Sequence, residues 1–116
     1  MSQEKFDAAK YEFVQITSVN EMEDGDRLFI ELGEQTLILL AVDGGYYAVR
    51  DVCTHDDGPL GDGELEGWQL VCPRHGARFD IRTGEALTLP AVVDVPVFPV
   101  RVVGGMIEVG IPRDNA

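Results

Sequence analysis

The sequence predicts an all-β protein, an antiparallel sandwich or barrel into which a smaller loop-rich segment is inserted. Thirteen glycines and six prolines in 116 residues indicate many tight turns. Several short runs alternate apolar and polar side chains, which is the two-residue period of a half-buried strand. No segment keeps the apolar period of 3.6 residues that an amphipathic helix needs. We therefore expect strands throughout the packed part of the chain.

The first half of the chain contains four strand signals. Residues 11–16 and 27–32 alternate apolar and polar side chains, as strands with one solvated face do. Residues 36–42 are apolar almost throughout and predict a strand that is buried on both faces. The Asp-Gly-Gly sequence at 43–45 suits a hairpin turn that needs positive φ, and residues 46–50 then return as the partner strand.

The C-terminal part contains a second hairpin signal. Residues 95–103 and 106–111 are rich in β-branched side chains and flank two adjacent glycines. Pro96 and Pro99 interrupt the first of these runs. Because proline has no amide hydrogen for a strand ladder, we expect this run at a sheet edge or in an irregular strand.

The strand pattern weakens between residues 51 and 83, where glycines accumulate and only a short helical turn at 62–66 is indicated. We expect one domain that comprises residues 1–116. Its base is formed by about 10–50 and 84–112, and residues 51–83 are a smaller subdomain inserted between them. Loops carried by a rigid sheet are common places for chemistry.

The charge of the chain excludes some classes of partner. Nine basic and twenty-one acidic side chains leave a formal net charge of −12. This balance argues against binding to nucleic acid and to anionic membranes, and it favours steering toward a basic partner. The first ten residues lack the apolar core of a signal peptide, and the longest apolar run, 37–42, is far too short to span a bilayer. We therefore expect a cytoplasmic protein.

Both cysteines and both histidines of the chain lie in the inserted segment. They form two pairs, Cys53 with His55 and Cys72 with His75, with sixteen residues between the pairs. Two such loops can bring four donors to one metal centre. A Cys₂His₂ set suits tetrahedral zinc, but zinc fingers usually place two cysteines before two histidines. The mixed order here favours a two-iron cluster in which one iron takes both thiolates and the other takes both imidazoles.

The motif around these pairs resembles the Rieske [2Fe–2S] family. The matching sequences are CTH at 53–55, CPRHGARFD at 72–80 and RTGEAL at 82–87. They are most similar to the small soluble Rieske ferredoxins of multicomponent, aromatic-ring-hydroxylating oxygenases. The resemblance is strong over the inserted segment and looser over the flanking strands. It implies one [2Fe–2S] cluster per chain, whose inner iron is bound by Cys53 and Cys72 and whose outer iron is bound by His55 and His75.

Four positions depart from the respiratory branch of this family. That branch has a second cysteine in each loop, and the two form a disulfide; this chain has Gly58 and Arg74 there. The branch also has a serine and a tyrosine where this chain has Ala77 and Phe79. We therefore expect the loops to be held together by hydrogen bonds and packing. Since fewer hydroxyl donors to sulfur stabilise the reduced cluster less, we expect a low reduction potential for a Rieske centre.

Five acidic side chains lie between the two ligand pairs, and no basic residue separates them. They are Asp56, Asp57, Asp62, Glu64 and Glu66, and three arginines follow at 74, 78 and 82. An ordinary solvated face explains such charges as well as a function does. The functional interpretation is an acidic rim that steers the cluster toward basic patches on redox partners.

The resemblance implies an electron carrier rather than an enzyme. Electrons would come from a flavin-containing, NAD(P)H-dependent reductase and pass to a terminal non-haem iron oxygenase. A terminal oxygenase needs two more histidines and a carboxylate for its mononuclear iron, and this chain has no further histidine. Two alternatives remain: a Rieske-like small subunit of a larger redox enzyme such as assimilatory nitrite reductase, and a structural zinc module.

Overall fold

The computed structural model describes residues 8–32, 35–53, 58–74, 76–89 and 93–113. These residues form strands and two short 3₁₀ turns, and none of their helices is long and apolar enough to cross a membrane. The 3₁₀ turns are η2 (Ala8–Lys10) and η3 (Val19–Glu21). The strands are β1 (Tyr11–Ser18), β2 (Arg27–Leu32), β3 (Gln35–Val42), β4 (Gly45–Arg50), β5 (Leu65–Glu66), β6 (Gln69–Val71), β7 (Arg78–Asp80), β8 (Val97–Phe98), β9 (Val100–Val103) and β10 (Met106–Pro112).

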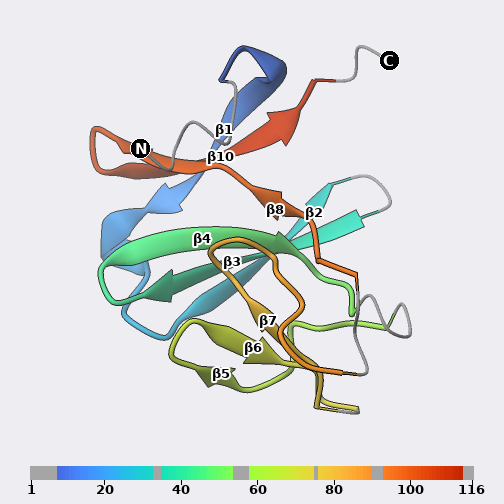
Figure 1. Cartoon of the computed structure of the whole chain (residues 1–116). Coiled ribbons are helices and arrows are strands. Elements are labelled where there is room, and N and C mark those ends of the chain that lie inside the picture. The colour runs from blue at the N-terminus through green and yellow to red at the C-terminus, as the bar shows by residue number, and fades with distance from the viewer. Residues whose placement is uncertain (1–7, 33–34, 54–57, 75, 90–92, 114–116) are drawn as a thin grey trace.

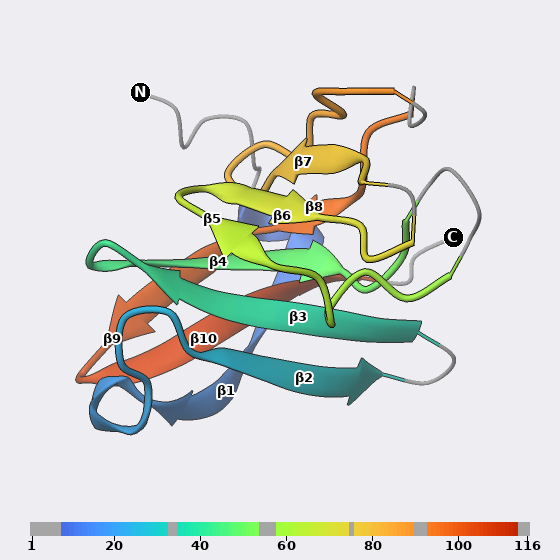
Figure 2. The same ribbon diagram turned by 90° about the horizontal axis from the view of Figure 1, so that it is seen from below.

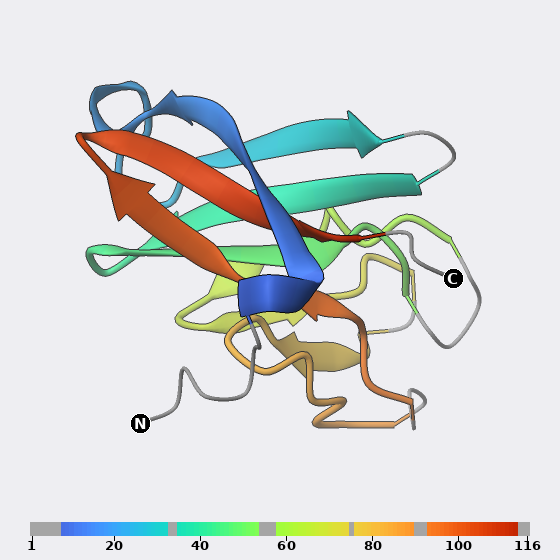
Figure 3. The same ribbon diagram turned by 90° about the horizontal axis from the view of Figure 1, so that it is seen from above.

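The strands form three antiparallel sheets arranged in layers (Figure 1). The outer sheet has the order β1-β10-β9, the central sheet β2-β3-β4-β8, and the small sheet β5-β6-β7. The central sheet lies between the other two, as the views from below and above make clear (Figures 2 and 3). The fold is therefore all-β, as the composition and the strand patterns predict.

Strand β3 explains how one central sheet supports two cores. Its side chains alternate between faces, as they do in any strand. Ile38, Leu40 and Val42 belong to the apolar cluster shared with the small sheet. Leu37, Leu39 and Ala41 belong to the cluster shared with the outer sheet. Both sets are buried, which confirms the expectation that this strand is covered on both faces. Burying each leucine or isoleucine stabilises the fold by about 1.5–3 kcal/mol.

Two hairpin turns agree with their glycine signals. The β3–β4 turn places Asp43 at φ 54° and Gly44 at φ 84°, and the β9–β10 turn places Gly104 at φ 59° and Gly105 at φ 80°. Two successive residues with positive φ define the type I′ turn, whose twist matches that of the flanking strands. The register of both hairpins follows from these two-residue loops.

Two sequence-based expectations need correction. The run at 95–103 lies at sheet edges, as its prolines predict, but it is not one strand: Pro99 divides it into β8, at the edge of the central sheet, and β9, at the edge of the outer sheet. The helical turn expected at 62–66 is wrong, because Leu65 and Glu66 form β5 and pair with Leu70 and Gln69. A tight turn at Gly67, with φ 62°, closes that hairpin, and pairing prevails over a weak local helical tendency.

Candidate metal centre

Two loops beside the small sheet carry the two cysteines. Each loop begins at its cysteine and closes in the same way. The amide of Cys53 donates a hydrogen bond to the carbonyl of Gly58 at 2.7 Å, and the amide of Cys72 donates to the carbonyl of Ala77 at 2.7 Å. Both bonds join a residue to the carbonyl five positions further along the chain. Residues 53–58 (the first loop) and 72–77 (the second loop) therefore place their cysteines at equivalent positions.

Both cysteines are buried in one apolar cluster. Cys53 is 0% exposed and Cys72 is 1% exposed, and the structure does not join them in a disulfide. The cluster also contains Leu60, Ala77 and Phe79, which are fully buried. Burial among apolar side chains disfavours a charged thiolate, and coordination to a cation offsets that cost. The pair of cysteines therefore fits one end of a metal centre.

Asp51 anchors the first loop to the central sheet. Its Oδ1 accepts hydrogen bonds from the amides of Leu60 and Gly61, at 2.7 and 2.6 Å. Its own amide donates to the carbonyl of Thr36 in β3 at 2.8 Å. One carboxylate, two residues before the first loop, is thus bonded to residues that follow the loop. Hydrogen bonds from amides to a charged acceptor are worth about 1.5–3 kcal/mol each.

Arg27 holds the same segment from the edge of the central sheet. Its Nη1 donates to the carbonyls of Gly61 and Gly63, the latter at 2.8 Å. Gly63 also lies against β6, since a Cβ at this position would be 1.7 Å from the carbonyl oxygen of Val71. Residues 60–63 are therefore fixed between β2 and β6, and this holds the segment that follows the first loop.

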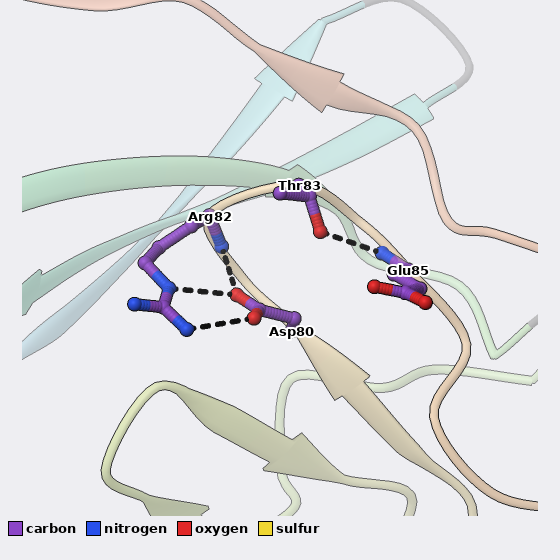
Figure 4. A network of polar contacts seen from close by, with 4 residues as sticks. All are labelled: Asp80, Arg82, Thr83 and Glu85. Atoms are coloured by element: carbon purple, nitrogen blue, oxygen red, sulfur yellow. Dashed lines mark hydrogen bonds and ion pairs between the residues drawn. The ribbon is translucent and has the colours of Figure 1, made fainter. Parts of the chain in front are cut away.

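A network of polar contacts shapes the turn that follows the C-terminal end of β7 (Figure 4). Asp80 accepts three hydrogen bonds from Arg82: from its amide at 2.9 Å, from Nε at 3.0 Å and from Nη2 at 2.9 Å. The bond to the guanidinium lowers the pKa of Asp80 below its ordinary value, against an opposing effect of burial. The Asp80 carboxylate in turn raises the pKa of Arg82, whose guanidinium lies 4.7 Å from the centre of the Trp68 ring.

At least one carboxylate of the acidic rim is neutralised by a basic partner. Asp62, Glu64 and Glu66 are exposed, but Glu66 forms an ion pair with Arg78 at 2.7 Å. Among the described residues, no ion pair involves Asp62 or Glu64. The other two acids of the expected rim, Asp56 and Asp57, lie outside the described residues.

The structure thus places two of the four ligands expected from the sequence, Cys53 and Cys72. The other two, His55 and His75, lie outside the described residues, and among the residues that are described no three metal-binding side chains come together.

Sequence reasoning missed the anchors of the first loop. Asp51 could have been found from its position two residues before Cys53. Arg27 gave no local signal, because its partners are 34 and 36 residues away.

Known proteins resemble this chain over most of its length. The Rieske [2Fe–2S] domain family matches residues 12–99. The ferredoxin component of the naphthalene 1,2-dioxygenase system of Pseudomonas putida is 33% identical over 90 residues, which cover 78% of this chain and 86% of that protein. The 3-phenylpropionate/cinnamic acid dioxygenase ferredoxin subunit of Escherichia coli K12 is 37% identical over 96 residues, covering 82% and 90%.

A solved structure shares the fold. A chain in the complex of reduced oxygenase and oxidised ferredoxin of carbazole 1,9a-dioxygenase superposes with a TM-score of 0.79 at 30% identity. The match covers 84% of this chain and 92% of that one. The family match spans most of β1, the strands β2 to β8 and the two cysteine loops. The chain therefore belongs to the Rieske [2Fe–2S] family of iron–sulfur proteins.

Proposed function

We propose that this chain is the ferredoxin component of a dioxygenase system, a carrier of single electrons with no catalytic site of its own. The observation that carries the proposal is the pair of buried cysteines at equivalent positions of two loops with the same closure. The relatives support it, because they are ferredoxin components of dioxygenase systems and the match covers most of their length.

The proposed site holds one [2Fe–2S] cluster per chain. Cys53 and Cys72 would bind the inner iron, and His55 and His75 would bind the outer iron. Bound there, the cluster supplies reversible one-electron chemistry. The chain itself buries the cysteine end among apolar side chains and holds the first loop through Asp51 and Arg27. We also propose that residues 1–116 form a single Rieske domain, with a base at about 10–50 and 84–112 and a cluster-binding subdomain at about 51–83.

The proposed partners are a flavin-containing, NAD(P)H-dependent reductase and a terminal non-haem iron oxygenase, all in the cytoplasm. The carbazole complex supports the second partner, since it contains an oxygenase and a ferredoxin. Interfaces between redox partners are small and transient, which suits a chain of this size with a large net charge.

The test combines spectroscopy with reconstitution. We expect the purified protein to be reddish-brown, to contain two irons per chain and to give a Rieske-type EPR signal after reduction. We also expect it to support NADH-dependent product formation when it replaces the ferredoxin in the naphthalene dioxygenase system. A colourless protein that contains zinc would overturn the proposal. So would stable co-purification with a large redox subunit, which would indicate a component of a larger enzyme.

The reduction potential is expected to lie in the lower third of the Rieske range of roughly −150 to +300 mV. Ala77 and Phe79 are both fully buried beside the cysteines, and neither side chain carries a hydroxyl that could donate to a sulfur. Such donors stabilise the extra negative charge of the reduced cluster, so their absence lowers the potential. Protein-film voltammetry measures it, and a value above about +150 mV would contradict this explanation.

The acidic rim predicts a salt-dependent rate of electron transfer to a basic acceptor. Cytochrome c is a suitable probe because it is basic and accepts one electron. The rate constant should fall as ionic strength rises, and it should fall less steeply for Asp62→Asn/Glu64→Gln. The control Glu12→Gln/Glu21→Gln removes the same charge from exposed positions on β1 and η3. The rates are measured by stopped flow. If the rate constants of both double variants depend equally on ionic strength, the rim does not steer the protein toward its partner.

A further inference from the structure

The second loop contacts the first through the side chain of Arg74. This exposed residue lies between Cys72 and Ala77, and its Nη1 donates a hydrogen bond to the carbonyl of Pro59 at 2.8 Å. Pro59 directly follows Gly58, whose carbonyl closes the first loop. A charged donor in the middle of one loop is therefore bonded to the closing end of the other.

Gly58 leaves the space that the guanidinium occupies. A Cβ at position 58 would lie 2.7 Å from Cζ of Arg74, 2.8 Å from Nη2 and 3.1 Å from Nε. Because Cζ is the nearest of the three atoms, the missing Cβ would point at the face of the guanidinium plane. Any larger residue at 58 would displace Arg74. The face of the Arg74 guanidinium thus covers the backbone of Gly58. At the edge of the same group, Nη1 donates its hydrogen bond to the carbonyl of Pro59.

The other anchors of the first loop serve a different purpose. Asp51 and Arg27 fix residues 60–63 to the central sheet, and neither reaches the second loop through the bonds described above. The second loop continues into β7 and the small sheet. The supports of the two loops meet at their bases, because Gly63 lies against Val71 at the end of β6, directly before Cys72. The bond from Arg74 adds a direct tie between the loops themselves.

We propose that Arg74 is a positioning residue, a clamp in which its guanidinium, seated on Gly58 and bonded to Pro59, holds the two cysteine loops at a fixed spacing. The proposal rests on the proposed function, because the loops are taken to hold the cluster. The clamp is non-covalent, so thiol reductants should leave it intact. Its exposure to solvent makes it weaker than a disulfide.

The first experiment compares Arg74→Leu with Arg113→Leu. Arg113 is a matched control, because it is also exposed and donates from Nε to a backbone carbonyl, that of Ala9 at 3.1 Å, and it follows β10 of the outer sheet rather than lying in a cysteine loop. The readout is the half-life of the visible absorbance of the oxidised cluster in excess chelator. We expect Arg74→Leu to shorten it about fivefold or more, as loss of a charged hydrogen bond at an exposed site implies. Arg113→Leu should leave it unchanged.

Two further variants separate positioning from a general effect of charge. Arg74→Lys keeps the charge but loses the planar donor group, so it should restore the half-life only in part. Gly58→Cys/Arg74→Cys removes the charge, but after treatment with oxidised glutathione its two thiols can form a disulfide between the same two loops. We expect this double variant to regain at least the wild-type half-life when oxidised and to lose it in dithiothreitol. The wild-type half-life should not respond to dithiothreitol.

Amide hydrogen exchange tests the clamp by a readout that does not depend on the absorbance of the cluster. The Cys53 amide is bonded to Gly58, so its exchange should accelerate in Arg74→Leu and not in Arg113→Leu. Equal half-lives and equal exchange in these two variants would overturn the clamp and leave the proposed function standing. Wild-type protein that contains no iron would overturn the proposed function instead, and the exchange experiment would still decide whether Arg74 ties the loops.

Discussion

Replacing Cys72 by serine is expected to abolish the iron–sulfur centre. Cys72 is 1% exposed and lies in the apolar cluster at the start of the second loop. A thiolate binds iron in its ionised form, whereas a serine hydroxyl stays protonated at neutral pH. The serine hydroxyl would also be buried in this apolar environment. Iron content should fall from two per chain to background, and the Rieske-type EPR signal should disappear.

The matched control for this change is Ala48→Ser. Ala48 is 1% exposed and lies in the core between the central and outer sheets, so this variant also adds a buried hydroxyl but removes no proposed ligand. It should lose stability and keep its cluster. The ligand assignment would be refuted by Cys72→Ser protein that retains two irons and the wild-type EPR spectrum.

Replacing Phe79 by alanine is expected to have the largest effect on stability. Phe79 is fully buried in the middle of β7, where it pairs with Leu70 in β6 and forms a bridge to Ala86. Its ring belongs to the same apolar cluster as both cysteines. Removing a buried phenylalanine ring costs about 3–5 kcal/mol, which is a large fraction of the 5–15 kcal/mol typical of a whole domain.

Denaturant unfolding measures this cost, and Phe29→Ala is its control. Phe29 lies on β2 and is 44% exposed, so truncating it should reduce the free energy of unfolding by less than half as much. We expect a lower midpoint for Phe79→Ala with an unchanged m-value. A difference from wild type of under about 1 kcal/mol would mean that the cysteine loops do not depend on this core.

Local patterns in the sequence were enough to predict most of the base. The strand at 27–32 has the expected bounds in the structure, and the strand at 36–42 differs by one residue at its start. Alternation and two-residue turns act between neighbours along the chain, so they can be read from the sequence. The split at Pro99 was less predictable, because it depends on which sheet each half of the run joins.

The sequence by itself determined the chemistry of the site: which four side chains are available, and that they lie in two short pairs. Only the tertiary structure decided how the loops that carry them are held. The hydrogen bond of Asp51 joins residues nine positions apart in the sequence, that of Arg74 fifteen, and that of Arg27 more than thirty. The local alternation of apolar and polar side chains does not predict contacts at such separations. The physical reason is that these bonds depend on where separate strands and loops pack in space, whereas metal-binding character belongs to each side chain.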